Sequence, residues 1–285
     1  MGRGDTGETS SVIELKPEDK ERLIAFLRTN IETNIFLLSV LDSSEPGRAK
    51  LVPDASFYAA ERSGTLAALI YVTSGGLCVP YAPNPSDLKP LVRSLRTSLR
   101  PRLLVGPRAE TDVVWNALNN PASARLFRRH RLYVLRTGQL ASGGHPGVRL
   151  AAARDLDRAA HFAACMQSEE LGLDPRQVDQ NRFRHRVARL IANEQFYVLP
   201  LGDTNAFQAS ASAQCVEGAQ VEAVYVPPTL RGRGWGRQGL AGMCEALLTR
   251  FPMVTLHVNE ENHSAVRLYE RLGFVADAPF RLISL

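Results

Sequence analysis

The sequence predicts an α/β (α+β) protein made of two domains that are copies of one fold. Three observations support this. The chain has 285 residues, of which 45% are hydrophobic, so it can bury a sizeable core larger than one typical domain needs. Both halves follow the order strand, two helices, a meander, helix, strand, helix, strand. Near their ends, residues 124–129 also align with residues 266–271. Each domain is therefore expected to be a mixed, mainly antiparallel twisted sheet flanked by helices.

The first half is expected to hold a flexible tail at 1–10 and a domain at 11–137. Helical and alternating patterns predict its elements. They are helices at 14–28 and 29–41, strands at 56–60, 66–73 and 76–81, a helix at 86–98, a strand at 102–106, a helix at 112–118, and a helix followed by a strand within 124–135.

A linker is expected at 138–147, because this stretch is rich in Gly and Ser and contains a proline. The second domain then covers 148–285. Its predicted elements are a strand at 148–150, helices at 156–171 and 176–192, strands at 196–200, 207–215 and 221–226, a helix from about 240, a strand at 254–259 and a closing helix after Asn262.

Composition and charge narrow the function classes. The net charge of +5 favours anionic ligands but is small for a nucleic-acid binder, so no nucleic-acid partner is expected. The four cysteines are far apart, which indicates a reducing compartment and no metal site. The start has no signal-like segment, and no apolar run approaches the roughly 20 residues of a membrane span. We expect a cytoplasmic protein without a membrane partner, either a monomer or a homodimer.

The most informative stretch is a glycine-rich turn between a strand and a helix. A β-branched strand ends at Val226-Pro227-Pro228, and the turn over 231–239 precedes a helix with a helical apolar stripe. Glycines let backbone amides approach a ligand, and a helix N-terminus offers free N–H donors and a positive dipole end. This combination favours a pyrophosphate ligand.

Three interpretations of the turn remain open on spacing alone. Gly234-x-Gly236-x-x-Gly239 matches a dinucleotide fingerprint, with Glu260 about 20 residues further on. Against it, five residues separate Val226 from Gly232, the first glycine of the turn, and little chain follows to complete such a sheet. A turn that only reverses the chain is the second interpretation. The third is a coenzyme A pyrophosphate loop.

Two motifs resemble the GNAT superfamily of acyl-CoA-dependent N-acyltransferases. Arg231-x-x-Gly234-x-Gly236, after Val224-x-Val226-x-Pro228, looks like its coenzyme A motif. Asn262-x-x-Ala265-x-x-Leu268-Tyr269-x-x-x-Gly273-Phe274 is similar to its closing helix and turn. The resemblance implies acetyl-CoA as cosubstrate. The positions it carries over for coenzyme binding are Val224, Tyr225, Val226, Arg231, Gly232, Arg233, Gly234, Trp235, Gly236, Arg237 and Asn262.

Catalytic roles are expected for Glu222 and Tyr269. An amine must lose a proton before it attacks a thioester, and a strand of period two would place Glu222 on one face with Val224 and Val226. The family uses an acid at this position as base or amine anchor. It also uses a backbone N–H, here at Tyr225 or Val226, for the developing oxyanion. Tyr269 matches its usual general acid, and Asn262 is expected both to contact coenzyme A and to cap the helix.

The first half departs from these motifs. Its corresponding loop, Cys78 to Ser86, has no glycine and has three prolines, which lack the N–H groups of a phosphate cradle. In the local alignment Phe127 stands where Tyr269 stands. We therefore expect a tandem protein whose first GNAT-like domain is degenerate, binding no coenzyme and catalysing nothing.

The acceptor is expected to be an amine, in a small molecule or a protein. Glu169, Glu170 and Asp174 lie where the family covers its acceptor site, and they either attract a cationic amine or form a solvated helix end. The predicted function is N-acetylation by direct transfer from acetyl-CoA, with Glu222 as base and Tyr269 as acid. The alternative is a non-catalytic acyl-CoA-binding sensor or interaction module.

Overall fold

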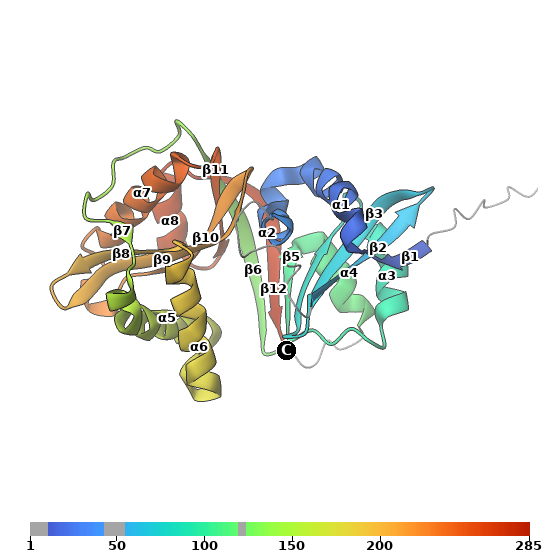
Figure 1. The fold of residues 1–285 in the computed structure, drawn as a ribbon, viewed down its shortest axis with the longest axis horizontal. Helices are drawn as coiled ribbons and strands as arrows, with labels where there is room; N and C mark the ends of the chain where they lie inside the picture. Colours follow the sequence, from blue (N-terminus) through green and yellow to red (C-terminus); the bar gives the residue numbers. More distant parts are fainter. Residues whose placement is uncertain (1–10, 43–54, 119–123) are drawn as a thin grey trace, which may run out of the picture. The chain divides into compact units, whose positions relative to one another are not determined.

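The structure is a computed structural model that describes residues 11–42, 55–118 and 124–285; the expected tail at 1–10 lies outside the described residues. The chain forms two compact units. Unit 1 comprises residues up to Arg131 together with Ala278–Leu285, and unit 2 comprises Leu132–Asp277. Each unit has a mixed sheet with helices on both faces (Figure 1), which confirms the predicted fold class.

Unit 1 contains the strand order β1-β2-β3-β4-β5-β12, with parallel pairing between β4 and β5 and antiparallel pairing elsewhere. Its strands are β1 (Ser11–Glu14), β2 (Ala55–Arg62), β3 (Thr65–Thr73), β4 (Leu77–Tyr81), β5 (Leu103–Pro107) and most of β12 (Val275–Ser284). Its helices are α1 (Lys20–Leu27), α2 (Ile31–Leu41), α3 (Leu88–Leu95) and α4 (Arg108–Ala117). The first two pack on one face of the sheet, where Phe26 lies against Tyr81 and Phe36 against Tyr71. The buried side chains of α3 and α4 fill the core on the other face.

One described stretch, Pro17–Leu41, has the length and composition of a membrane-crossing helix, with 25 residues and a mean hydropathy of 1.3 over an 18-residue window. The sequence expectation that no apolar run is that long was therefore too strict. Here the stretch is two helices separated by a 3₁₀ turn at Arg28–Asn30, and Leu23, Leu27 and Ile35 are buried in unit 1. Because a buried core helix meets the same criteria, the stretch is weak evidence for a membrane span.

Unit 2 has the strand order β7-β8-β9-β10-β11-β6. Strands β10 and β11 are parallel, whereas β7 with β8, β8 with β9 and β9 with β10 pair antiparallel. Its strands are β7 (Arg149–Leu150), β8 (Phe196–Leu201), β9 (Thr204–Cys215), β10 (Gly218–Tyr225), β11 (Met253–Asn259) and the second part of β6 (Leu126–Arg136). Helices α5 (Leu156–Leu171) and α6 (Pro175–Ala192) cover one face, and α7 (Trp235–Leu248) and α8 (His263–Arg271) cover the other (Figure 1).

The last strand of each sequence half ends in the unit built mainly from the other half. β6 passes from unit 1 into unit 2 after Arg131, and β12 passes from unit 2 into unit 1 after Asp277. Phe280 to Ser284 pair with β5, and Arg281 holds Asp112 of α4 through two contacts of 2.9 Å. The compact units therefore follow different boundaries from the expected domains at 11–137 and 148–285.

The local alignment of residues 124–129 with residues 266–271 was wrong as a structural match. Residues 126–136 form strand β6, without the predicted helix, whereas 266–271 lie in helix α8. The reason is periodicity: exposure alternates along Leu126–His130, as it does on a half-buried strand. By order along the chain, α4 is the counterpart of α8, and α4 contains no tyrosine.

The expected linker at 138–147 lies within unit 2 and packs against α7. Gly144 N–H donates to the Glu245 carboxylate at 3.0 Å, and His145 N–H donates to the Gln238 carbonyl at 3.0 Å. A Cβ on Gly144 would lie 2.0 Å from the Gly242 backbone of α7. The glycine at position 144 therefore allows residues 138–147 to pack closely against α7.

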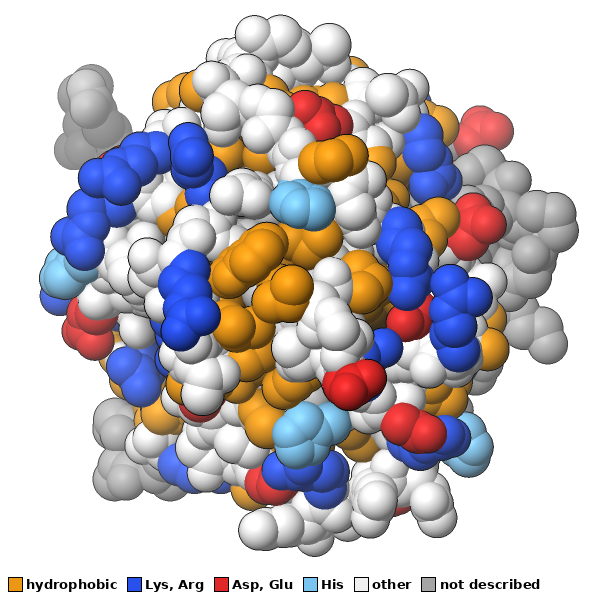
Figure 2. All heavy atoms as spheres, turned by 90° about the vertical axis from the view of Figure 1, so that its left-hand side faces the viewer, with side chains coloured by type: hydrophobic (Ala, Val, Ile, Leu, Met, Phe, Trp, Pro, Cys, Tyr) orange, Lys and Arg blue, Asp and Glu red, His pale blue; other side chains and the backbone are white. Residues whose placement is uncertain are grey.

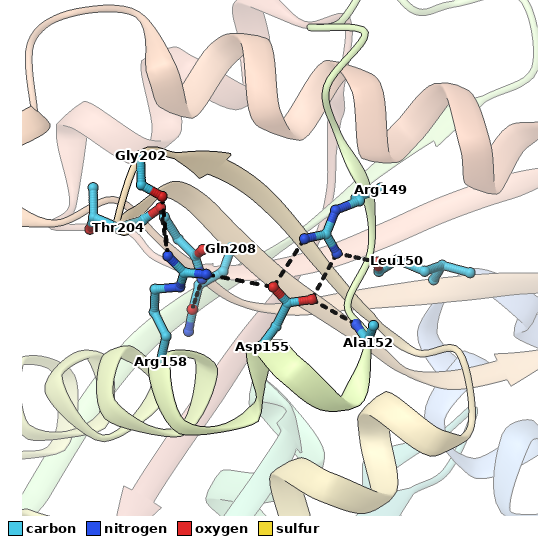
Figure 3. Close-up of polar contacts among 9 residues, drawn as sticks. Arg149, Leu150, Ala152, Asp155, Arg158, Gly202, Thr204 and Gln208 are labelled. Carbon is cyan, nitrogen blue, oxygen red and sulfur yellow. Dashed lines mark hydrogen bonds and ion pairs between the residues drawn. The ribbon is translucent and has the colours of Figure 1, made fainter.

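A buried carboxylate fixes the start of α5 (Figure 3). Asp155 is only 1% exposed, accepts from Arg149 Nη1 and Nη2 at 2.7 and 3.0 Å, and accepts from Ala152 N–H at 2.8 Å. Arg158 is the second arginine that pairs with Asp155, and its Nη1 also donates to the carbonyl groups of Gly202 and Thr204. The hydrogen bonds from Arg149 hold the pKa of Asp155 below its ordinary value. This network ties α5 to β7 and to the β8–β9 turn.

Candidate active site

Strands β10 and β11 pair along only part of their length. The recorded pairs are Ala219 with Val254, Gln220 with Thr255 and Val221 with Leu256. Beyond them β10 continues to Tyr225 and β11 to Asn259 without further pairing. The backbone N–H and C=O groups of β10 and β11 beyond Val221 and Leu256 are therefore not paired with each other. We call this stretch, 222–225 opposite 257–259, the β10–β11 separation.

The glycine-rich loop follows β10 and leads into α7. Gly232 and Gly234 have φ values of +77° and +84°, a conformation that suits glycine. Gly234 is the N-cap of α7, so the N–H groups of Trp235, Gly236 and Arg237 begin the helix without intrahelical acceptors. Arg233 and Arg237 are exposed beside them. This arrangement suits a pyrophosphate, as the sequence predicted.

Gly239 has a different task from the loop glycines. A Cβ at this position would lie 2.2 Å from the Phe207 ring of β9, so glycine lets α7 approach the sheet. The mainly antiparallel sheet also differs from the parallel sheet that the dinucleotide fingerprint requires. The fingerprint interpretation of Gly234, Gly236 and Gly239 was therefore wrong.

Glu222 lies on the opposite face of the sheet from the one predicted for it. Ala223 has φ +54°, and the register with β9 shifts on both sides of Glu222, so the strand alternation breaks there. Val224 and Val226 pack in the core beneath α7 and α8. Glu222 instead shares the α5 side with Gln220, whose Nε2 donates to its Oε1 at 2.8 Å. Ser212 Oγ donates to the other carboxylate oxygen at 2.6 Å.

Tyr225, Arg231 and Glu169 form one cluster. The Tyr225 hydroxyl donates to Glu169 Oε1 at 3.0 Å, and Arg231 Nη2 lies 2.7 Å from Glu169 Oε2. Arg231 also donates to the Val226 carbonyl at 3.0 Å and lies over the Tyr225 ring. Burial and the hydrogen bond to Glu169 raise the pKa of Tyr225 to about 12. The side chain of Arg231 is thus committed to α5 and to the end of β10.

Tyr269 lies on the other side of the sheet from Glu222. Its ring contacts Tyr133 of β6 and Phe274, and only 7% of the residue is exposed. Burial, with a contribution from the charge of Glu170, raises the pKa of Tyr269 well above its ordinary value of 10. Because Glu222 lies on the α5 side and Tyr269 on the α7 and α8 side, a molecule held in the β10–β11 separation would reach both faces.

Asn262 caps α8, which confirms that part of its expected role. Its Oδ1 accepts from Ala265 N–H at 3.2 Å and from the Ser264 hydroxyl at 2.9 Å. The cap orients the helix that carries Tyr269. Contact between Asn262 and a coenzyme stays a prediction.

Two of the three acidic residues predicted near the α5–α6 junction, Glu169 and Asp174, are paired with arginines. Asp174 caps α6 and forms an ion pair with Arg176 at 2.7 Å, just as Glu169 pairs with Arg231. On the face of unit 2 in Figure 2, basic and acidic side chains lie around a hydrophobic centre. The junction therefore offers less net negative charge to a cationic acceptor than its sequence suggests.

Unit 1 lacks the corresponding geometry. In its loop, the Asn84 side chain accepts from Ser86 N–H, while Pro83 and Pro85 have no N–H. The pairs of β4 and β5, Leu77 with Leu103 and Cys78 with Leu104, also end before the strands do. However, a Cβ on Gly106 of β5 would lie 3.1 Å from the Pro80 carbonyl of β4, so these two strands stay close beyond their last pair. The absence of coenzyme binding by unit 1 stays a prediction, now supported by this geometry and by the lack of tyrosine in α4.

Two contributors to the site were absent from the sequence prediction. Ser212 and Gln220 both bind the Glu222 carboxylate. A signal for Ser212 existed, since polar residues recur at every second position of an otherwise apolar strand: Gln208, Ser210, Ser212 and Gln214. Within the described ranges, no cluster of three His, Cys, Asp or Glu side chains suits a metal ion.

Comparison with known proteins finds a family match in the second half of the chain and two curated relatives. Residues 202–281 match the family described as FR47-like protein. The chain is also similar to the peptidyl-lysine N-acetyltransferases YjaB of Salmonella typhimurium, with 37% identity over 57 residues, and of Escherichia coli, with 36% over 59 residues. These matches cover 20% and 21% of this chain and 37% of each relative, so the chain spans little more than a third of their length.

Solved structures resemble the chain over nearly its whole length. A Drosophila protein superposes with a TM-score of 0.71 at 13% identity, covering 97% of this chain and 99% of that one. A tandem GNAT protein from the clavulanic acid biosynthesis pathway gives 0.56 at 11% identity, with coverage of 97% and 98%. The chain therefore has the fold of tandem GNAT proteins, and residues 202–281 in its second half match the FR47-like family.

Proposed function

We propose that unit 2 transfers an acetyl group from acetyl-CoA directly to a primary amine, without a covalent enzyme intermediate. The observation that carries this proposal is the β10–β11 separation, which begins beside Glu222 and ends beside the glycine-rich loop. The coenzyme pyrophosphate would bind the N–H groups at the start of α7, with Arg233 and Arg237 near its phosphates. The pantetheine arm would then lie along Val224 to Val226 and reach Asn262.

The chemistry assigns one task to each side of the sheet. The amine nitrogen attacks the thioester carbon, and its surplus proton passes to Glu222, directly or through water. The N–H of Tyr225 or Val226 meets the developing oxyanion. The C–S bond breaks, and the thiolate leaves with the electron pair and receives a hydrogen bond or proton from Tyr269. Because a thiol is ordinarily a stronger acid than a buried tyrosine, hydrogen-bond donation by Tyr269 is the favoured form.

The first acceptor to test is the ε-amine of a lysine in a protein or peptide. The YjaB relatives are named peptidyl-lysine N-acetyltransferases, and this chain matches 37% of the length of each. Free amino acids and polyamines form the second group of acceptors. A protein acceptor would reach the site from the α5 side, where Glu222 lies.

The experiment measures thiol release from acetyl-CoA and identifies acetylated products by mass spectrometry. Wild type is incubated with lysine peptides and with small amines, beside Glu222→Gln and the control Glu21→Gln, which lies in unit 1. We expect turnover for wild type and Glu21→Gln and a loss of at least about 10²-fold for Glu222→Gln. Coenzyme binding without release for any acceptor would support the non-catalytic binding module instead.

A further inference from the structure

Two side chains orient the Glu222 carboxylate. Ser212 Oγ donates to Oε2 at 2.6 Å, and Gln220 Nε2 donates to Oε1 at 2.8 Å. Ser212 comes from β9, whereas Gln220 lies two residues before Glu222 on β10. An ionised carboxylate has about four lone-pair positions. Each oxygen therefore keeps a position for a proton from an amine or from a bridging water.

Opposite register shifts in β9 and β10 bring these three side chains together. Gln220 pairs with Ala213, Glu222 with Ser210 and Tyr225 with Gln208. Between the first two of these pairs, β9 has one more residue than β10, in the segment that holds Ser212. Between the last two pairs, β10 has one more residue than β9, in the segment that holds Ala223. Bulges redirect side chains and are frequent beside active sites. The two bulges cancel, so the register change is confined to the segment around Glu222.

A buried glutamine supports the bulge in β9. Gln195, which is 3% exposed and directly precedes β8, donates from Nε2 to the Ser212 carbonyl at 3.2 Å. The backbone carbonyl of Gln195 accepts from Ala211 N–H at 2.8 Å. Both backbone groups that flank the bulge are thus fixed by one residue. The Ser212 backbone is therefore held in place independently of Glu222.

We propose that Ser212 and Gln220 are positioning residues that hold the Glu222 carboxylate in the orientation for proton acceptance. This inference rests on the proposed function, in which Glu222 is the base. Neither residue is assigned to contact substrate or coenzyme. A free glutamate side chain samples many rotamers, and a displacement of about 1 Å in a catalytic group costs up to about 10²-fold in rate. Two fixed donors remove that freedom.

The first test is structural and needs no acceptor. Crystal structures of full-length wild type, Ser212→Ala, Ser212→Thr and Gln220→Leu are compared at the Glu222 carboxylate. We expect one orientation in wild type and Ser212→Thr, and a displaced or multiple orientation in Ser212→Ala and Gln220→Leu. A carboxylate that keeps its wild-type position in both of the last two variants would overturn the inference.

The second test separates positioning from folding. With the acceptor found above, we expect kcat to fall about ten- to a hundredfold in Ser212→Ala, with the Kd for acetyl-CoA within about twofold of wild type. Ser212→Thr keeps the hydroxyl and is expected to recover most of kcat. The control Ser39→Ala removes a part-buried serine hydroxyl of α2, bonded at 2.7 Å to the Phe36 carbonyl, and is expected to change neither quantity.

The two proposals fail in different ways. An unchanged kcat in Ser212→Ala beside a strongly reduced kcat in Glu222→Gln would refute the positioning role alone. Full activity of Glu222→Gln would refute the base in the proposed function, and the crystal structures would still decide whether Ser212 and Gln220 orient the carboxylate. Loss of acetyl-CoA binding in Ser212→Ala would show a structural role and count against the inference.

Discussion

Arg231 Nη2 lies 2.7 Å from Glu169 Oε2, which joins the predicted coenzyme loop to the helix predicted to cover the acceptor. The same carboxylate accepts from the Tyr225 hydroxyl at 3.0 Å. Glu169 was expected to attract a cationic amine, and Arg231 was expected to contact coenzyme phosphates. In this structure each side chain neutralises the other. The ion pair therefore links the glycine-rich loop to α5.

Glu169→Gln is expected to weaken acetyl-CoA binding by only about two- to fivefold. The reason is exposure: Arg231 and Glu169 have side chains 48% and 46% exposed, and such pairs contribute at most about 1 kcal/mol. Calorimetric titration measures the affinity. The matched control is Asp157→Asn, which removes an exposed pair with Arg184 between α5 and α6 at the same 2.7 Å. A larger rise in the KM of a cationic acceptor than in the Kd of acetyl-CoA would instead indicate direct acceptor binding by Glu169.

Tyr269→Phe is expected to lower kcat by about 10²-fold or more while acetyl-CoA still binds. Phenylalanine keeps the ring contacts to Tyr133 and Phe274 and removes only the hydroxyl. Because the pKa of Tyr269 lies well above 10, the hydroxyl stays protonated through the neutral range, and wild-type activity should show no loss from its ionisation below about pH 10. Thiol release across pH checks both statements. Equal turnover of the two proteins would remove Tyr269 from the mechanism.

The full chain is expected to bind one acetyl-CoA. Gly106 keeps β5 close to Pro80 of β4 in unit 1, whereas β10 and β11 separate in unit 2. Gly234→Val places a β-branched residue at φ +84° and should abolish all coenzyme binding. Calorimetry gives the stoichiometry, and Gly138→Val is the control, because it has the same φ of +84° and open space around it. A stoichiometry near two, or binding that survives Gly234→Val, would place a site in unit 1.

The sequence predicted the order of most elements and the glycine-rich turn before α7 well, because strong local signals carry both. Gly232 and Gly234 have the positive φ that a tight turn needs. The helix predicted from about 240 is present as α7, although it already starts at Trp235. It failed where a single residue changes a long-range relation. A positive φ at Ala223 turns Glu222 to the other face, and no sequence rule assigns positive φ to alanine. The match between 124–129 and 266–271 failed because similar residues serve a strand in one place and a helix in the other.

Removal of Ala278–Leu285 is expected to destabilise unit 1, although these residues follow the second half in sequence. They pair with β5, and Arg281 binds Asp112 of α4 twice at 2.9 Å. Without them β5 would present an unpaired edge. Hydrogen exchange should show lost protection at 103–107, with a smaller change in β9. Full protection of β5 in the truncated chain would show that pairing with β12 does not stabilise unit 1.

Asp155→Asn is expected to lower the free energy of unfolding by about 2–3 kcal/mol at pH 7, since it weakens hydrogen bonds from a charged arginine to a buried group. The pH dependence has a definite sign. The pKa of Asp155 is lower in the folded chain than the ordinary value of 3.8, so the unfolded chain binds the proton more tightly. The stabilisation is complete above about pH 5 and is lost as the pH falls through the folded pKa. Urea unfolding at pH 7 and in steps below pH 4 measures this: the difference between wild type and Asp155→Asn should shrink in acid, whereas a constant difference would mean that the carboxylate charge contributes nothing.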